Sequence, residues 1–173
     1  METGFDTYMN SGYNFERTPK KTLIVRWHSS SDKKTIDLSL TEPLKIDVLS
    51  DIYLDNFTTF HNASNDPTFN APEKSAFVLN INEFNTQSNI AGPDGKRNNI
   101  FNNIVIPSDA LTNNTTTKIT KSHKSKKMNY ICSINPTTFT KITGKITDLD
   151  GGNIFSSSED DMFLAEFVFV ARK

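Results

Sequence analysis

The clearest alternation of side-chain types lies near the end of the chain. One face of an expected strand there is entirely apolar, with Phe163, Ala165, Phe167, Phe169 and Ala171. The residues between them are Leu164, Glu166, Val168, Val170 and Arg172, and most of these are apolar too. Because successive side chains of a strand point to opposite faces, the pattern predicts a central strand that is covered on both sides.

A polar turn precedes this closing strand. The segment from Thr147 to Asn153 contains Asp-Gly-Gly, and these residue types supply the positive φ angles and side-chain-to-backbone bonds of tight turns. Ile142 and Ile146 lie just before the turn in a run of strand-forming residues. We therefore expect a hairpin between this run and the closing strand.

Shorter runs with the period of a strand occupy much of the preceding chain. They lie at residues 23–28, 36–40, 44–48, 52–60, 77–81, 104–106 and 130–134. Pro43 is expected to break one run and Pro107 to end another. The Asn/Pro-rich residues 61–74 are expected to form a long loop. No window shows convincing helical spacing, although residues 109–111 and 136–141 each have room for one helical turn.

About eight short strands joined by turns and long loops predict an all-β sandwich or barrel. The 173 residues are enough for one domain with a substantial core, which we assign to residues 22–173. Residues 1–21 have no periodic pattern and are expected to form an extended N-terminal arm.

The predicted arm carries four isolated aromatic residues, Phe5, Tyr8, Tyr13 and Phe15, among small polar ones. Such a segment cannot build a core of its own, yet its aromatic rings are costly to leave in water. Either the arm folds back onto its own domain, or it reaches a neighbouring subunit and contributes these four residues to the interface.

Composition narrows the range of partners. The net charge of −1 and the pI near 6.3 give no general attraction to nucleic acid or to anionic membranes. Cys132 is the single cysteine, so no intramolecular disulfide is possible, and we expect a small buried side chain in a reducing compartment. No apolar run approaches the length of a membrane span, and no secretory signal is recognised, so we expect a protein that is not secreted.

Candidate catalytic and metal-binding groups are sparse. Asp148, Asp150 and Glu159 match three positions of a calcium loop, but Asn153 stands where that loop requires Gly, so a plain turn is favoured. His28, His61 and His123 show no spacing typical of metal ligands. The segment Gly92–Arg97 lacks the spacing of a phosphate-binding loop. We therefore predict no catalytic, metal-binding or cofactor-binding residues.

One dense cluster of positive charge lies within residues 118–127. Its cations are Lys118, Lys121, Lys124, Lys126 and Lys127. The segment is either a solvated loop that limits self-association, or a contact for phosphate or for an acidic partner. No aromatic residues are interleaved to stack on bases, so sequence-specific reading of nucleic acid is not expected.

Two segments suggest a family. Ser50-Asp51-Ile52-Tyr53-Leu54-Asp55-Asn56-Phe57 and the stretch from Ile142 to Gly151, read with the order of the strands, resemble single jelly-roll penton and minor capsid proteins of large double-stranded DNA viruses and virophages. The resemblance covers residues 22–173. It implies an eight-stranded jelly-roll sandwich, a structural role in the virion, assembly in the host cytoplasm, and a homo-oligomer, with a pentamer favoured, that contacts neighbouring capsid proteins.

Two other classes remain open. One is a β-sandwich binding module of tumour-necrosis-factor-like or carbohydrate- and receptor-binding type, such as a fibre tip. The other is an enzyme on a β-sandwich or cupin-like barrel, which would need a histidine cluster that this sequence does not show. We favour a non-enzymatic protein.

Overall fold

The computed structural model describes residues 20–29, 32, 34–60, 76–84, 103–107, 128–155 and 161–172. Every regular element in this part of the chain is a β-strand, so the all-β prediction is confirmed there. The eight strands are β1 (Lys20–His28), β2 (Thr35–Ile46), β3 (Ser50–Phe60), β4 (Ala76–Ile81), β5 (Asn103–Pro107), β6 (Asn129–Ile134), β7 (Thr137–Thr147) and β8 (Met162–Ala171).

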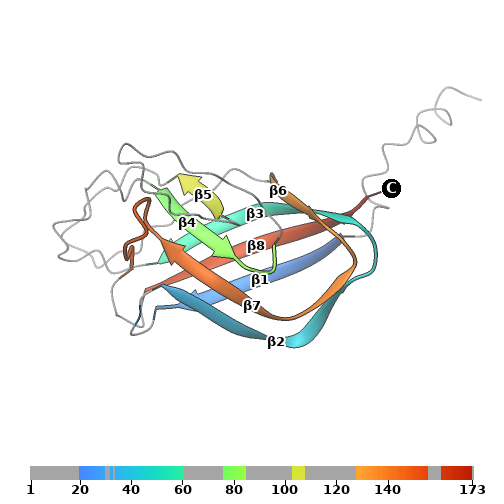
Figure 1. The fold of residues 1–173 in the computed structure, drawn as a ribbon, viewed down its shortest axis with the longest axis horizontal. Coiled ribbons are helices and arrows are strands. Elements are labelled where there is room, and N and C mark those ends of the chain that lie inside the picture. The colour runs from blue at the N-terminus through green and yellow to red at the C-terminus, as the bar shows by residue number, and fades with distance from the viewer. Residues whose placement is uncertain are drawn as a thin grey trace, which may run out of the picture.

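The strands form two four-stranded antiparallel sheets. The first sheet has the order β1-β8-β3-β6, and the second has the order β2-β7-β4-β5. Figure 1 shows the second sheet lying in front of the first, so that the two pack as a sandwich. Hydrophobic burial between the two inner faces stabilises this arrangement.

The pairing of strands follows a simple rule along the chain. The first strand pairs with the last, β2 pairs with β7, β3 with β6, and β4 with β5. The described chain is therefore folded back on itself around the connection between β4 and β5. The pairs β1–β8 and β3–β6 lie in the first sheet, and the pairs β2–β7 and β4–β5 lie in the second, so that successive pairs alternate between the sheets.

The core is centred on the inner face of β8. Phe163, Ala165, Phe167 and Phe169 are at most 2 % exposed. They are flanked in the first sheet by Leu23, Val25 and Trp27 of β1 and by Ile52, Leu54 and Phe57 of β3. Phe84, which follows β4, packs edge-on against Phe167 with ring centroids 4.9 Å apart. Aromatic packing of this kind adds to the stabilisation from buried area.

The closing strand is central, as predicted, because β8 pairs with β1 on one side and with β3 on the other. Its outer face is covered less completely than we expected. Val168 is buried, but Leu164, Glu166 and Val170 retain intermediate exposure. The two faces of β8 are thus unequal.

The predicted hairpin before β8 is wrong, although the turn itself is present. Gly151 has a φ of 81°, and Asp148 Oδ1 accepts hydrogen bonds from the backbone N–H groups of Asp150 and Gly152. However, β7 and β8 belong to different sheets. The turn therefore begins a connection across the sandwich instead of closing a hairpin.

Two further local expectations need correction. Pro43 interrupts the pairing without ending the strand: β2 runs from Thr35 to Ile46, but its pairing with β7 stops after Ser39 and resumes at Leu44. This is possible because β2 is an edge strand, where a missing N–H costs little. Residues 137–141 form the start of β7 and not a helical turn, since Phe139 is buried opposite Leu44. Residues 109–111 and 61–74 lie outside the described residues.

Candidate interaction surface

The residues that the sequence singled out for contacts fall outside the described part of the chain. This holds for Phe5, Tyr8, Tyr13 and Phe15 of the predicted arm and for Lys118, Lys121, Lys124, Lys126 and Lys127 of the basic segment. Their roles stay predictions. The described residues nevertheless contain a surface that the sequence did not point to.

The individual candidates for chemistry are dispersed. His28 is exposed at the end of β1, where its Nε2 accepts a hydrogen bond from Arg26 Nε at 3.1 Å. His61, His123 and Glu159 lie outside the described residues. Across the ranges that the structure describes, no three His, Cys, Asp or Glu residues are grouped as metal ligands would be.

Two residues have the structural roles that the sequence predicted. Asp148 is 5 % exposed and uses its carboxylate to hold the turn after β7 through backbone N–H groups. Cys132 is 6 % exposed within β6 and contributes to the core. Both observations agree with the packing and turn interpretations of these residues.

The two sheets differ in the residues that they present outward. We define the apolar face as the outer surface of the first sheet formed by Ile24, Tyr53, Tyr130, Leu164, Val168 and Val170. Ile24 is 62 % exposed on β1 and Tyr130 is 52 % exposed on β6, at opposite sides of the sheet. Glu166 and Asn56 lie between these two residues on the same face, so its apolar side chains are interspersed with polar ones.

A hydrogen-bonded network orders one side of the apolar face. Tyr53 and Tyr130 meet edge to face with ring centroids 5.7 Å apart. The hydroxyl groups of Tyr130 and Ser133 are 3.0 Å apart, and Ser133 Oγ donates to Asp51 Oδ1 at 2.7 Å. Arg172 Nε donates to the same oxygen at 2.8 Å. The network connects β3, β6 and the residue after β8, so it fixes the orientation of two tyrosines and one arginine.

Asp51 is the centre of this network. Burial alone would raise the pKa of Asp51, but the hydrogen bonds from Ser133 and Arg172 outweigh burial and hold the pKa below its ordinary value. The contact with Asp51 also raises the pKa of the Arg172 guanidinium. Both groups therefore stay charged at neutral pH. The carboxylate and its two donors stabilise the arrangement in which Tyr130 faces outward.

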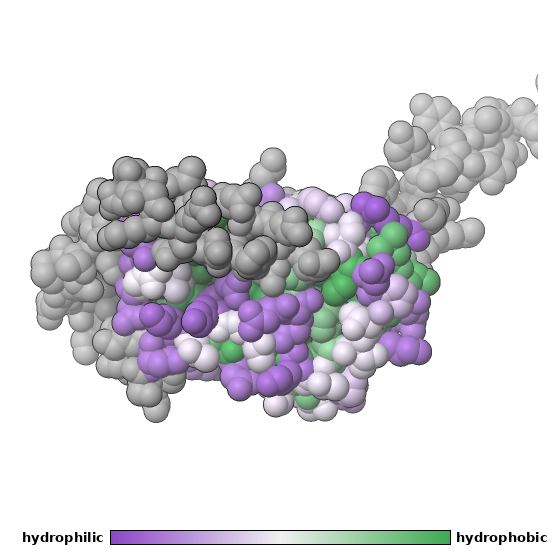
Figure 2. Space-filling model, in the orientation of Figure 1, coloured by the Kyte–Doolittle hydropathy of each residue, from purple (hydrophilic) through white to green (hydrophobic). Residues whose placement is uncertain are grey.

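On β2 and β7 the outer surface of the second sheet has the opposite character, whereas β5 of the same sheet exposes Val105. We define the polar face by Thr35, Asp37, Ser39, Lys141, Thr143 and Lys145 on β2 and β7. Lys141 Nζ is 3.8 Å from Asp37 Oδ1, and the Glu83 carboxylate accepts hydrogen bonds from both the N–H and the hydroxyl of Thr143. In Figure 2 the side that carries β2 and β7 is largely purple and white.

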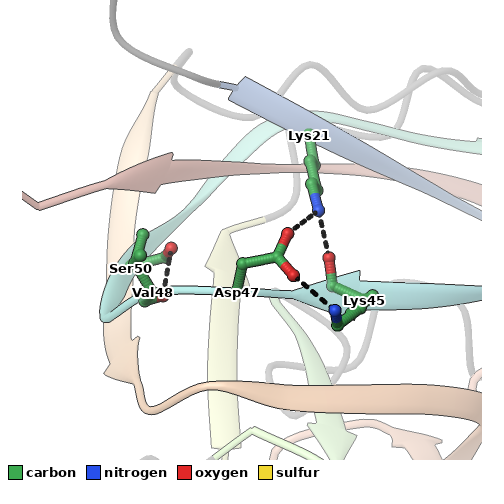
Figure 3. Close-up of polar contacts among 5 residues, drawn as sticks. All are labelled: Lys21, Lys45, Asp47, Val48 and Ser50. Atoms are coloured by element: carbon green, nitrogen blue, oxygen red, sulfur yellow. Dashed lines mark hydrogen bonds and ion pairs between the residues drawn. The ribbon is translucent and has the colours of Figure 1, made fainter.

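The two sheets are tied together along the edge where β1 and β2 meet. Lys21 Nζ on β1 donates to Asp47 Oδ2 at 2.8 Å and also to the carbonyl oxygen of Lys45, while Lys45 Nζ is 3.0 Å from Asp47 Oδ1 (Figure 3). The hydrogen bonds from Lys21 and then from Lys45 lower the pKa of Asp47. Trp27 Nε1 adds a second link by donating to the Thr35 carbonyl at 2.7 Å.

Comparison with known proteins gives no family. No protein-family model matches the chain, and no curated protein matches it. In the portions of the chain covered by the structure there is no helix with the length and apolarity needed to cross a membrane. The functional argument therefore depends on the fold and on the surface.

Proposed function

We propose that the chain is a single jelly-roll shell subunit, a structural protein that acts through contacts with other subunits. The observation that carries this proposal is the pairing of strands. The strands pair from the two ends of the described chain inward, beginning with β1 and β8 and ending with β4 and β5, and the pairs are divided between two four-stranded sheets. This pairing is expected of a jelly roll, in which a chain folded back on itself is wound into a double sheet. Jelly rolls are common in viral capsids, although the fold alone does not assign a function.

The character of the surface supports a role in assembly. The described residues present two tyrosines on the apolar face and the Arg172 guanidinium beside them, and aromatic and arginine side chains are enriched where subunits meet. We infer that the protein is a penton or minor capsid component, located in the virion after assembly in the host cytoplasm. Its partners are other copies of the chain, with a pentamer favoured, and neighbouring capsid proteins.

The mass in solution tests this proposal. Light scattering coupled to size exclusion should give five times the mass of the 19.5 kDa chain, and antibodies to the protein should label purified particles of its virus. A protein that is monomeric under all assembly conditions and missing from particles would contradict a shell role.

The predicted arm and the basic segment have separate roles in this proposal. The aromatic residues of the arm order against a neighbouring subunit, whereas the lysines of residues 118–127 contact either phosphate or an acidic partner. Deleting residues 1–19, which leaves β1 intact from Lys20, should preserve the β-sheet circular dichroism spectrum and weaken oligomerisation. Unchanged assembly of this truncated chain would contradict the role of the arm.

One observation favours a second function, that of a receptor- or glycan-binding module. Tyr130 is 52 % exposed beside a carboxylate and a guanidinium, and an aromatic ring next to such groups suits the stacking and hydrogen bonding of a saccharide. A glycan array should then show a specific ligand, and Tyr130→Ala should abolish its binding. An array without a specific signal would leave subunit contact as the role of this surface.

A further inference from the structure

The connection between β2 and β3 presents two apolar side chains to solvent. We call its residues, Asp47, Val48 and Leu49, the corner. Val48 is 48 % exposed and Leu49 is 39 % exposed, and they are the only consecutive pair among the exposed large hydrophobic residues of the described ranges. Because β2 and β3 belong to different sheets, the corner bridges the two layers of the sandwich.

Polar contacts hold the backbone of the corner in place. Ser50 Oγ donates to the Val48 carbonyl at 2.9 Å, and the Arg172 N–H donates to the Leu49 carbonyl at 2.8 Å. The Asp47 carboxylate is held by two lysine ammonium groups (Figure 3). The carbonyl groups of both apolar residues are therefore already bonded, and what the corner offers to a partner is a pair of aliphatic side chains on an ordered backbone.

The corner lies at the end of the sandwich where β1 begins (Figure 1). Lys20 pairs with Val170 and Ser50 pairs with Ala171, so only β8 separates the start of β1 from the residue that follows the corner. Two strand spacings of about 4.8 Å put the corner roughly 10 Å from Lys20.

The segment that precedes β1 is complementary to the corner in charge and in side-chain type. Residues 1–19 contain three acidic side chains and one basic side chain, together with the four aromatic residues of the predicted arm. Around the corner the balance is reversed, because four cations and two carboxylates lie there: Lys20, Lys21, Lys45 and Arg172, with Asp47 and Asp51. An acidic segment rich in aromatic groups thus ends beside a basic surface that exposes aliphatic groups.

These features point to one occupant. We propose that the chain's own arm folds back and packs Tyr13 and Phe15 against Val48 and Leu49 of the corner. Phe15 is five residues before Lys20, and an extended chain of that length spans up to about 17 Å, which is more than the distance to the corner. So short a tether gives the arm an effective concentration in the millimolar range, which favours it over a free partner. In the proposed shell, identical subunits offer identical corners, so an arm exchanged between neighbours meets the same residues.

Protease access to the arm tests this contact in the full chain. Limited digestion with chymotrypsin, which cuts after aromatic residues, followed by mass spectrometry gives the cleavage rates after Tyr13 and Phe15. The double variant Val48→Ser/Leu49→Ser should raise both rates roughly tenfold or more, because the arm loses its apolar partner. Rates equal to those of the natural chain would overturn the proposal.

The matched control is Val105→Ser. Val105 is 45 % exposed but lies on β5, in the second sheet, so its replacement should leave the cleavage of the arm unchanged. An equal rise in this control would overturn the proposal, and thermal melting of each variant verifies that the domain is folded.

A substitution in the arm tests the same contact from the other side. Phe15→Ser lies outside the sandwich and leaves Tyr13 as the reporter. It should raise cleavage after Tyr13, and adding it to the corner variant should raise the rate no further, because both changes remove one contact. Rises that multiply in the combined variant would mean that arm and corner act independently, and would overturn the proposal.

Dilution identifies the chain that supplies the arm. Protection after Tyr13 should persist when the natural chain is diluted to the mass of a single copy, because a tethered contact does not depend on concentration. Protection that is lost on dilution would assign the corner to the arm of a neighbouring copy and would overturn the proposal. The shell function is tested separately, by the mass at high concentration and by the labelling of particles.

Discussion

The inner faces of the two sheets are alike, whereas their outer faces are not. Both inner faces are built from Phe, Ile and Leu side chains that are nearly all below 10 % exposure. Outside, β2 and β7 present threonine, lysine and aspartate, while the outer face of the first sheet combines aliphatic and tyrosine side chains with Arg26, Asp51 and Glu166. The inner rows account for the sandwich, so the contrast between the outer rows is the better guide to contacts with other molecules.

The polar groups of the two sheets are also used differently. On the second sheet, Glu83 and Thr143 satisfy each other across the surface. On the first sheet, Asp51 and its donors Ser133 and Arg172 hold tyrosine rings in place. A polar network that already holds aromatic side chains in place lowers the conformational entropy that they lose on binding. Such pre-ordering favours a binding surface over a surface that only contacts water.

The largest expected loss of stability comes from a substitution on the inner face of β8, compared with one on its outer face. Phe167→Ala removes a side chain with 0 % exposure and should lower the free energy of unfolding by about 3–5 kcal/mol. Leu164→Ala on the outer face of β8 should cost only about 1 kcal/mol, since its side chain is half-buried and leaves no closed cavity. Urea unfolding of both variants measures the difference. Similar losses would mean that the outer face is part of a closed core.

A glycine in the second sheet should give the next largest effect. A Cβ added at Gly144 would lie 1.9 Å from the carbonyl oxygen of Asn80, because β7 and β4 pair closely there. Gly144→Ala should therefore destabilise the protein by about 1–3 kcal/mol or more through displacement of backbone. The neighbouring Lys145→Ala, at an exposed position, should change the unfolding midpoint little. If Gly144→Ala leaves the free energy of unfolding unchanged, β4 and β7 can move apart at this point without loss of stability.

Local periodicity predicts the inner rows of this fold well. Leu23, Val25 and Trp27 alternate with exposed residues, and β8 shows the same pattern on its inner face. It fails where the chain departs from a period of two. Leu54 and Phe57 are both buried although three positions apart, because the bulge at Asp55 resets the alternation.

Long-range pairing explains what the sequence could not reveal. The turn at Asp148–Gly152 has a clear local signal, but nothing local states that the next strand joins the other sheet. The Asp51 network unites residues that lie 82 and 121 positions apart in the chain. Without the register of β3 with β6 and β8, the outward Asp51 and Tyr53 look like ordinary surface residues of a strand.

The Asp51 network should make a moderate and pH-dependent contribution to stability. Its side chain is 18 % exposed and accepts two hydrogen bonds, so Asp51→Asn should cost about 1–2 kcal/mol at pH 7. The folded pKa of Asp51 is lowered from 3.8, so its contribution is complete above that value and is lost as the pH falls through the lower folded pKa.

Urea midpoints at pH 7 and pH 3 measure this dependence. The difference between the natural chain and Asp51→Asn should shrink toward acid, while Asp37→Asn, whose side chain is 68 % exposed, should have little effect at either pH. A difference that is equal at the two pH values would mean that the charge of Asp51 contributes nothing.

The smallest effect is expected at the edge that joins the sheets. The hydrogen bonds from Lys21 and Lys45 lower the pKa of Asp47, so its contribution to stability, like that of Asp51, is lost as the pH falls. The side chain of Asp47 is 52 % exposed, which makes this contribution small. In Asp47→Asn, Lys21 keeps its bond to the Lys45 carbonyl, and so the edge stays linked. The small shift in midpoint should disappear at about 0.5 M salt, where exposed charges are screened over a few ångströms. A large, salt-resistant loss would instead make this edge a principal support of the sandwich, and the contrast between the two sheets would then extend to how they are joined.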